Sequence, residues 1–261
     1  MLYLYKKKGQ NLNKKVIFKY EHNFAFTLAE VLITLGIIGV VAALTIPTLI
    51  SNYQKQEYVA KLKKTYSILT QAFLELTNEY GCNGNLVCTG LLEEDEGISK
   101  YTYYYYSKKL SEKLIKYIKT AEICGIEPNK GCFPSATASN FDGTGNKSNM
   151  DADSYYKFVT VDGVAIYIAN GADNCTTITD AIPACGWVTL DINGPKKPNA
   201  IGRDTFYFDI INTDGVALLP SGSPKMTGVE IDDSPYPCTK ENPIGYYCTA
   251  KIVQNGWQMD Y

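Results

Sequence analysis

An apolar run dominates the N-terminal part of the sequence. Between Phe26 and Ile50 the only charged residue is Glu30, and the next charge is Lys55. The 21 residues that end at Ile46 would form a helix of about 31 Å, which matches the roughly 30 Å hydrocarbon layer of a bilayer. The pattern therefore predicts one membrane-length helix followed by a more polar chain.

A one-sided apolar stripe follows this run. Its members recur at spacings of three and four, which is typical of an amphipathic helix: Val59, Leu62, Tyr66, Leu69, Phe73, Leu76 and Tyr80. Four lysines lie off the stripe (Lys55, Lys61, Lys63 and Lys64), and Gly81 is the predicted C-cap. We expect this helix to pack on the core of its own domain. A coiled coil with a partner is the alternative.

The next part of the chain, residues 82–155, has no clear period, and we expect it to be irregular. A short helix is predicted over 108–120, where Leu110, Leu114, Ile115 and Ile118 are apolar. The tyrosines at 101 and 103–106 form an aromatic cluster, interpreted as packing under a loop rather than as a ligand-stacking surface. Residues 134–154 are rich in Ser, Asn, Gly and Asp, so a mobile loop is predicted there.

From Tyr155 onward the pattern is typical of strands. Residues 158–161 and 164–168 flank Asp162-Gly163 and predict a β-hairpin. Further strands are predicted at Trp187 to Ile192, Thr205 to Ile211 and Val216 to Leu219. A long N-terminal helix followed by an antiparallel sheet defines the fold class as α+β.

Composition and charge exclude several classes of protein. With 45% hydrophobic and 12% aromatic residues, the 261-residue chain is not globally disordered. The formal net charge of −2 does not suggest nucleic-acid binding. His22 is the single histidine, so histidine-based catalysis and multi-histidine metal sites are excluded, and Gly143-Thr144-Gly145 follows no predicted strand. We therefore predict that the protein is not an enzyme.

The basic residues are concentrated at the N-terminus. Residues 1–25 contain six lysines and one acid, which is typical of a membrane-targeting leader. Three interpretations of the leader and the apolar run compete. They are a secretory signal processed near Ala42-Ala43, a plain membrane anchor, and the stem of a filament subunit. A secretory apolar region is usually only ~7–15 residues long, and a plain anchor would carry Glu30 at a cost of ~2–3 kcal/mol.

The residues around Glu30 favour the filament subunit. The stretch from Ala25 to Leu32 resembles the prepilin processing motif of type IV pilins and type II secretion pseudopilins. The resemblance implies cleavage between Ala25 and Phe26 and N-methylation of Phe26. Glu30 would then be the fifth residue of the processed chain and Pro47 the twenty-second, where many type IV pilins have a helix-kinking proline. Ala25 departs from the glycine usual in that family.

The resemblance also implies an organisation and a set of partners. Residues 1–25 would be a leader, 26–50 a transmembrane and assembly helix, 51–80 its amphipathic continuation, and 81–261 an exported, disulfide-stapled α+β body of pilin-like fold. The partners would be other pilins or pseudopilins, the prepilin peptidase/methyltransferase, the inner-membrane assembly platform and membrane lipid, with no nucleic acid.

The implied location is a single pass through the bacterial inner membrane, with the leader cytoplasmic and the body outside, and then a pilus or pseudopilus. Glu30 would pair with the Phe26 ammonium of a neighbouring subunit. The alternative is an extracytoplasmic binding protein or enzyme on a plain signal anchor.

Eight cysteines follow the apolar run, and none forms a Cys-x-x-Cys pair. Without further histidines these spacings do not suit zinc, so we predict disulfides formed in an oxidising compartment. Eight cysteines allow 105 pairings. The spacing favours the four sequence-local couples: Cys82–Cys88, Cys124–Cys132, Cys175–Cys185 and Cys238–Cys248.

One polar segment collects oxygen ligands. Asp191, Asn193, Asn199 and Asp204 lie close together in the sequence. The segment loosely resembles the C-terminal sheet loop in which some major pseudopilins bind calcium. The competing interpretation is a turn whose Asx side chains bond their own backbone. We assign no metal residue and no cofactor from the sequence, and calcium stays open.

Overall fold

A computed structural model describes eleven parts of the chain. These are residues 26–92, 103–128, 130–133, 138–152, 155–170, 175, 177–178, 182–212, 215–239, 241–242 and 244–261. The chain divides into two compact units between Leu49 and Ile50. The expected leader with Ala25, the tyrosine at 101 and the side chains of 103–106 lie outside the described residues.

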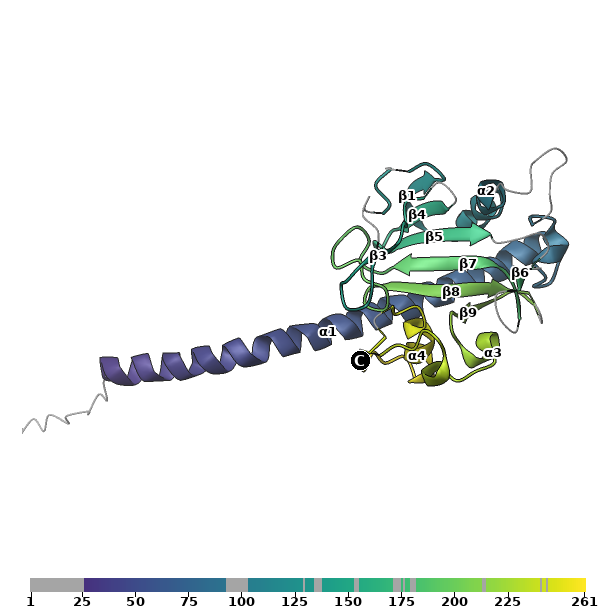
Figure 1. The fold of residues 1–261 in the computed structure, drawn as a ribbon. Coiled ribbons are helices and arrows are strands. Elements are labelled where there is room, and N and C mark those ends of the chain that lie inside the picture. The colour runs from purple at the N-terminus through teal and green to yellow at the C-terminus, as the bar shows by residue number, and fades with distance from the viewer. Residues whose placement is uncertain are drawn as a thin grey trace, which may run out of the picture. The chain divides into compact units, whose positions relative to one another are not determined.

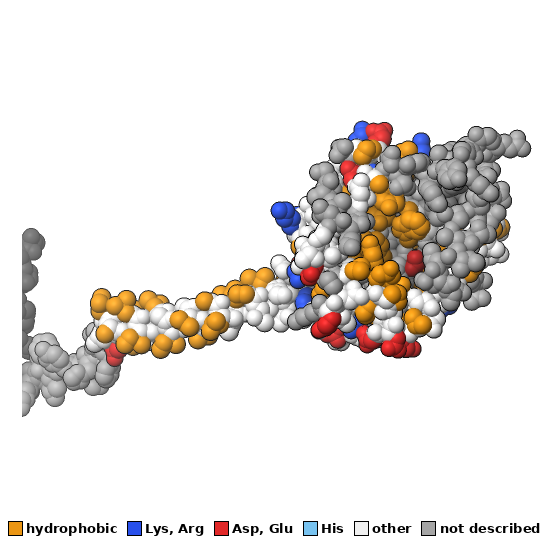
Figure 2. All heavy atoms as spheres, in the orientation of Figure 1, with side chains coloured by type: hydrophobic (Ala, Val, Ile, Leu, Met, Phe, Trp, Pro, Cys, Tyr) orange, Lys and Arg blue, Asp and Glu red, His pale blue; other side chains and the backbone are white. Residues whose placement is uncertain are grey.

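Helix α1 runs from Leu28 to Glu79 and includes Pro47. Among the described residues it is the one helix long and apolar enough to cross a membrane, with a mean hydropathy of 2.3 over a window of which 0% is buried. Figure 2 shows hydrophobic side chains along this part of the helix. The exposed members include Leu28, Leu32 and Ile38, at 80%, 60% and 63%.

The second half of α1 has one buried face. Five members of the expected stripe are buried: Val59, Leu62, Leu69, Phe73 and Leu76. Tyr66 is partly buried and stacks on Phe208 of the sheet, with the ring centroids 5.4 Å apart. The interpretation as a helix on its own domain's core is therefore confirmed over residues 59–76.

The prediction that Tyr80 is the last residue of the apolar stripe is wrong, because α1 ends one residue earlier. Tyr80 is 38% exposed because the helix ends at Glu79. The N–H of Gly81 donates to the carbonyl of Asn78, and the N–H of Cys82 donates to the carbonyl of Thr77. This is a Schellman motif with Gly81 in the left-handed region at φ +71°, so the predicted C-cap is confirmed.

The body is built on a seven-stranded antiparallel sheet with the order β1-β4-β5-β7-β8-β9, and β6 pairs with β7 (Figure 1). The strands are β1 Thr120–Gly125, β4 Tyr156–Thr160, β5 Ala165–Asn170, β6 Thr177–Ile178, β7 Pro183–Asp191, β8 Thr205–Ile211 and β9 Ala217–Pro220. A separate two-stranded sheet contains β2 Ala138–Ser139 and β3 Asn146–Ser148. The α+β class is confirmed.

Short helices complete the body. They are α2 Tyr103–Leu114, α3 Pro224–Thr227 and α4 Cys248–Gln254, with 3-10 turns η1 Val87–Thr89, η2 Ile115–Tyr117 and η4 Ile231–Asp233. Side chains alternate across the sheet, as β8 illustrates. Phe206, Phe208 and Ile210 join the core formed with α1, whereas Tyr207 belongs to a second cluster. The sheet therefore has packed residues on both faces.

The prediction of an irregular segment at 82–155 is wrong, because this part contains β1 and the β2–β3 hairpin as well as a helix. The short helix predicted over 108–120 is present as α2 and η2, but α2 begins earlier, at Tyr103, and η2 ends at Tyr117. Strand β1 lies at the edge of the sheet, and three consecutive residues in it, Ala121 to Ile123, are exposed. An edge strand with so little burial has no alternating pattern by which a sequence reveals it.

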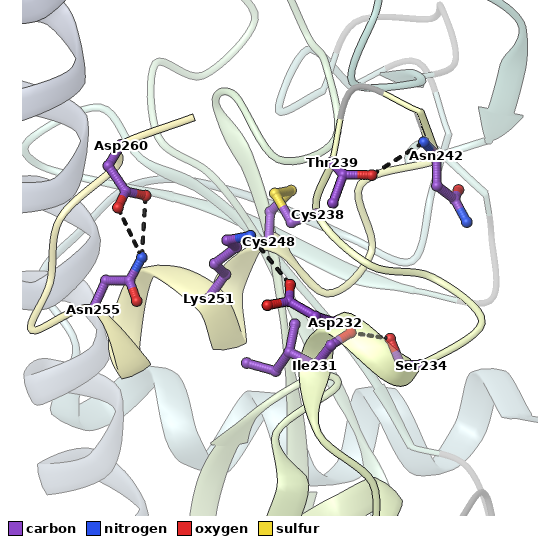
Figure 3. A network of polar contacts seen from close by, with 10 residues as sticks. All are labelled: Ile231, Asp232, Ser234, Cys238, Thr239, Asn242, Cys248, Lys251, Asn255 and Asp260. Atoms are coloured by element: carbon purple, nitrogen blue, oxygen red, sulfur yellow. Dashed lines mark hydrogen bonds and ion pairs between the residues drawn. A yellow bond between two sulfur atoms is a disulfide. The ribbon is translucent and has the colours of Figure 1, made fainter.

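All four predicted disulfides are confirmed: Cys82–Cys88, Cys124–Cys132, Cys175–Cys185 and Cys238–Cys248. Figure 3 shows the last of them beside α4. There the Lys251 ammonium lies 3.2 Å from Oδ1 of Asp232, and Nδ2 of Asn255 donates to the carboxylate of Asp260. The disulfide joins the start of α4 to Cys238, and the two polar contacts lie at exposed side chains.

Candidate functional site

The expected assembly segment forms the start of α1. Thr27 precedes the first helical residue, and its hydroxyl accepts a 3.2 Å hydrogen bond from the Glu30 N–H. In return, the N–H and the hydroxyl of Thr27 both donate to Oε2 of Glu30 over 2.8 Å. This reciprocal pair is a capping box, in which a Thr and a Glu three residues later satisfy the free N–H groups of a helix start.

The capping box gives Glu30 a role that our sequence analysis missed. The signal was present, because a Thr followed three residues later by Glu, ahead of an apolar run, is the signature of this motif. Phe26 lies just outside the helix and is 84% exposed. Pairing of Glu30 with a neighbour's Phe26, and a kink at Pro47, stay predictions.

A second group of polar residues lies in the loop between β7 and β8. Asp191 is the last residue of β7, Asp204 immediately precedes β8, and both side chains are 0% exposed. Burial raises the pKa of Asp191 well above its usual value, the Asp204 carboxylate raises it further, and the N–H groups of Asn193 and Gly194 act against both. Burial also raises the pKa of Asp204. The Asp204 carboxylate therefore disfavours the charged form of Asp191.

The two carboxylates differ in their partners. Oδ1 of Asp204 accepts a 2.7 Å hydrogen bond from the N–H of Ala200, and its Oδ2 accepts from the N–H of Asn199 and from Nδ2 of Asn193. By contrast, Oδ1 of Asp191 and Oδ1 of Asn193 are buried and find no hydrogen-bond donor among the described residues. Buried oxygens without a partner are costly and call for a physical explanation.

The side-chain amide of Asn199 lies between two acceptors. With its NH2 group turned toward them, Nδ2 of Asn199 donates to Oδ2 of Asp191 over 3.2 Å and to the carbonyl of Lys196 over 2.8 Å. The hydrogen-bond network selects this orientation, because a carboxylate and a carbonyl can only accept.

The contacts of this loop do not fit a calcium ion, which takes six to eight carboxylate, amide and carbonyl oxygens at about 2.3–2.6 Å. Both carboxylate oxygens of Asp204 accept hydrogen bonds from N–H groups, and Asn193 turns its NH2 group toward Asp204. The described residues contain no group of three His, Cys, Asp or Glu that could hold a metal ion. Side chains that bond the backbone of their own loop are those of the competing interpretation, an Asx-type turn.

No family model matches the chain, and neither a curated protein nor a solved structure matches it.

Proposed function

We propose that the chain is a pilin-like structural subunit of a type II secretion pseudopilus or a type IV pilus. A prepilin peptidase cleaves it before Phe26, the new amine is methylated, and the subunit crosses the inner membrane once with its disulfide-bonded body outside. Subunits then assemble through the first half of α1.

One observation carries the proposal: the first half of α1 presents a continuous apolar surface with one carboxylate at its start. All residues from 26 to 50 are exposed except Ala42, which is partly buried. Exposed apolar surface of this extent is unfavourable in water, at roughly 25 cal/mol per Å², so it requires a bilayer or neighbouring helices. Glu30 is the one charge on this surface.

The position of Glu30 supports assembly rather than simple anchoring. A carboxylate in an apolar environment is unfavourable unless a cation meets it, and the same holds for an ammonium. Cleavage before Phe26 would create an ammonium that the methyl group leaves charged. Pairing this ammonium with Glu30 of the next subunit would neutralise both charges and fix the axial register of the filament.

The disulfides support export of the body. All eight cysteines are paired, and they lie after the apolar run. Disulfides persist in oxidising compartments and are rare in the cytosol. The body would therefore face the periplasm or the cell exterior, as a pilus or pseudopilus subunit requires.

Charge removal at Glu30 tests the proposal. Glu30→Val should leave membrane insertion intact and reduce the sheared filament fraction about tenfold or more, because a neighbour's ammonium is left unpaired in an apolar core. Glu30→Gln should be intermediate, because its amide accepts a hydrogen bond without a charge.

Thr34→Val is the matched control. It also replaces a polar side chain in the apolar run, and among the described residues the Thr34 hydroxyl donates to two backbone carbonyls of its own helix, those of Glu30 and Val31. This variant should assemble as the unmodified protein does. Normal assembly by Glu30→Val would refute the pairing.

A further inference from the structure

The loop between β7 and β8 presents charges of one sign to the solvent. Lys196, Lys197 and Arg203 are exposed, and none of them forms an ion pair with another described residue. The two acids at the ends of the loop, Asp191 and Asp204, are 0% exposed. The outer surface of the loop is therefore basic.

Side-chain amides bond the backbone of the loop where its two lysines lie. Nδ2 of Asn193 donates to the carbonyl of Lys197 over 3.2 Å, and Nδ2 of Asn199 donates to the carbonyl of Lys196 over 2.8 Å. The N–H of Asn199 donates in turn to Oδ2 of Asp204 over 2.9 Å. A loop that is ordered before it binds loses less conformational entropy when a partner arrives.

The loop reaches the part of α1 that directly follows the apolar run. Nδ2 of Asn193 lies 3.1 Å from the hydroxyl of Tyr58, and about 12 Å of helix separates Tyr58 from Ile50, the last residue of the run. A cavity of about 630 Å³ is lined by Ser51 of α1 and by Arg203 of the loop, among others. The loop therefore extends along the helix as far as the residue after the run. Figure 1 shows this loop and the turn between β4 and β5 at the same end of the sheet.

We propose that Lys196, Lys197 and Arg203 bind the phosphate groups of anionic phospholipids, in the leaflet from which α1 emerges on the side of the body. The proposal rests on the membrane crossing in the proposed function. The polar headgroup layer on each side of a bilayer is about 5–8 Å thick. A helix that leaves the hydrocarbon at Ile50 would bring the cations of the loop to this layer, where long basic side chains reach lipid phosphates.

The surroundings of the loop suit a headgroup layer. Tyr53, three residues after the run, is 68% exposed, and tyrosine is enriched where a membrane meets water. Three acids line the cavity of about 560 Å³ beside the two lysines of the loop, namely Glu57, Glu122 and Asp162. Glu57 and Asp162 each form an ion pair with a lysine of α1. Most of the negative charge near the loop is therefore already neutralised by α1.

Lysine acetylation of the full chain in vesicles tests the proposal. The chain is reconstituted in phosphatidylcholine and in an equal mixture of phosphatidylcholine and phosphatidylglycerol, and treated with acetic anhydride. Lys196 and Lys197 should react several-fold more slowly in the mixed vesicles. Lys108 on α2 and Lys225 on α3, which Figure 1 places toward the other end of the sheet, should react equally in both. Equal protection by free glycerol phosphate in phosphatidylcholine vesicles would overturn the lipid as the source of the phosphate.

Charge removal separates the loop from the general surface charge. Lys196→Gln with Lys197→Gln should raise the Kd of the full chain in detergent for phosphatidylglycerol about tenfold or more, as measured by native mass spectrometry. The matched control, Lys108→Gln with Lys225→Gln, should leave this Kd unchanged. An unchanged Kd for the loop variant would overturn the proposal, and a loss of filament assembly beside an unchanged Kd would assign the loop to a neighbouring subunit instead.

Alkaline carbonate extraction of the same vesicles distinguishes the two proposals. A chain that resists extraction but shows the same lysine reactivity in both kinds of vesicle would overturn the lipid contact and leave the filament proposal standing. A chain that carbonate releases would contradict the membrane crossing, and with it both proposals.

Discussion

Oε2 of Glu30 accepts hydrogen bonds from both the N–H and the hydroxyl of Thr27, each over 2.8 Å. In the filament proposal this carboxylate pairs with the Phe26 ammonium of a neighbouring subunit. In the single chain it is already hydrogen-bonded to Thr27. Hydrogen bonds from Thr27 to a carboxylate are already charge-assisted and roughly twice as strong as bonds between neutral groups. The local contact therefore holds Glu30 in place, and a neighbour's ammonium would have to compete with it or bind alongside it.

The Thr27 hydroxyl should matter for the start of α1. Thr27→Val removes the capping hydroxyl and should cost about 1 kcal/mol of helix stability in the first turn. Hydrogen exchange of the amides of Leu28 to Val31, measured in detergent, should become several-fold faster. Thr27→Ser keeps the hydroxyl and serves as the control. Equal protection in the Val and Ser variants would contradict the role of the capping box.

The disulfides should leave no free thiol. Alkylation of the denatured, unreduced protein should label none of the eight cysteines, and alkylation after reduction should label all eight. Replacing both Cys238 and Cys248 by Ala should reduce the free energy of unfolding by ~2–3 kcal/mol, the value expected for a loop of this length. A stability unchanged by this double replacement would show that the crosslink does not restrain the unfolded chain.

The second half of α1 should be a major source of stability. Phe73 is 1% exposed in the core, so Phe73→Ala should reduce the free energy of unfolding by ~3–5 kcal/mol through lost burial and a cavity. The neighbouring Leu74 is 44% exposed, and Leu74→Ala should change the free energy of unfolding by less than about 0.5 kcal/mol. Denaturant unfolding followed by tryptophan fluorescence measures both. Similar losses for the two variants would contradict packing of this face on the sheet.

An ion pair between Lys64 and Asp162 should make stability depend on pH. The Lys64 ammonium lies 2.8 Å from Oδ2 of Asp162, in the turn between β4 and β5. Burial raises the pKa of Asp162, but hydrogen bonds from Lys64 and Thr160 outweigh burial and lower it overall. A lowered folded-state pKa stabilises the fold above the unfolded-state pKa of about 4, and this contribution is lost as the pH falls through the folded-state value.

The effect should be small because Lys64 is 59% exposed. Lys64→Met should lower the free energy of unfolding by less than about 1 kcal/mol at pH 7, and the difference from the unmodified protein should vanish in acid. Combining Lys64→Met with Asp162→Asn in a double-mutant cycle isolates the pair. A difference that persists unchanged below the folded-state pKa of Asp162 would contradict the assignment.

Regular periodicity made a large part of the fold predictable. The stripe on α1, the cap at Gly81 and strand β8 at Thr205–Ile211 were expected from spacing and from turn residues. Local cysteine spacing also predicted the disulfides, because pairs closed by short loops are the simplest of the possible pairings. In each case the information lies within a short window of sequence.

The rest depends on contacts between distant parts of the chain. Lys157 is 0% exposed in β4, where its ammonium lies 3.3 Å from Oδ1 of Asp151 and donates to the carbonyl of Ala152. No strand pattern predicts a buried lysine. The contact between Tyr58 and Asn193 spans 135 residues and is equally invisible in the sequence. The sequence shows that the loop between β7 and β8 is rich in oxygen ligands, but the burial of these oxygens and their hydrogen bonds are visible only in the folded chain.

Mass analysis of the N-terminal peptide from membrane-extracted protein tests the central claim most directly. If the chain is a pilin-like subunit, the peptide begins at Phe26 and carries one methyl group on its amine. The same sample can be compared with protein made in a host without prepilin peptidase, where residues 1–25 should be retained. A chain that begins near Leu44 would indicate a secretory signal, and an uncut chain beside active peptidase would indicate a plain anchor. Either result would contradict the proposed function.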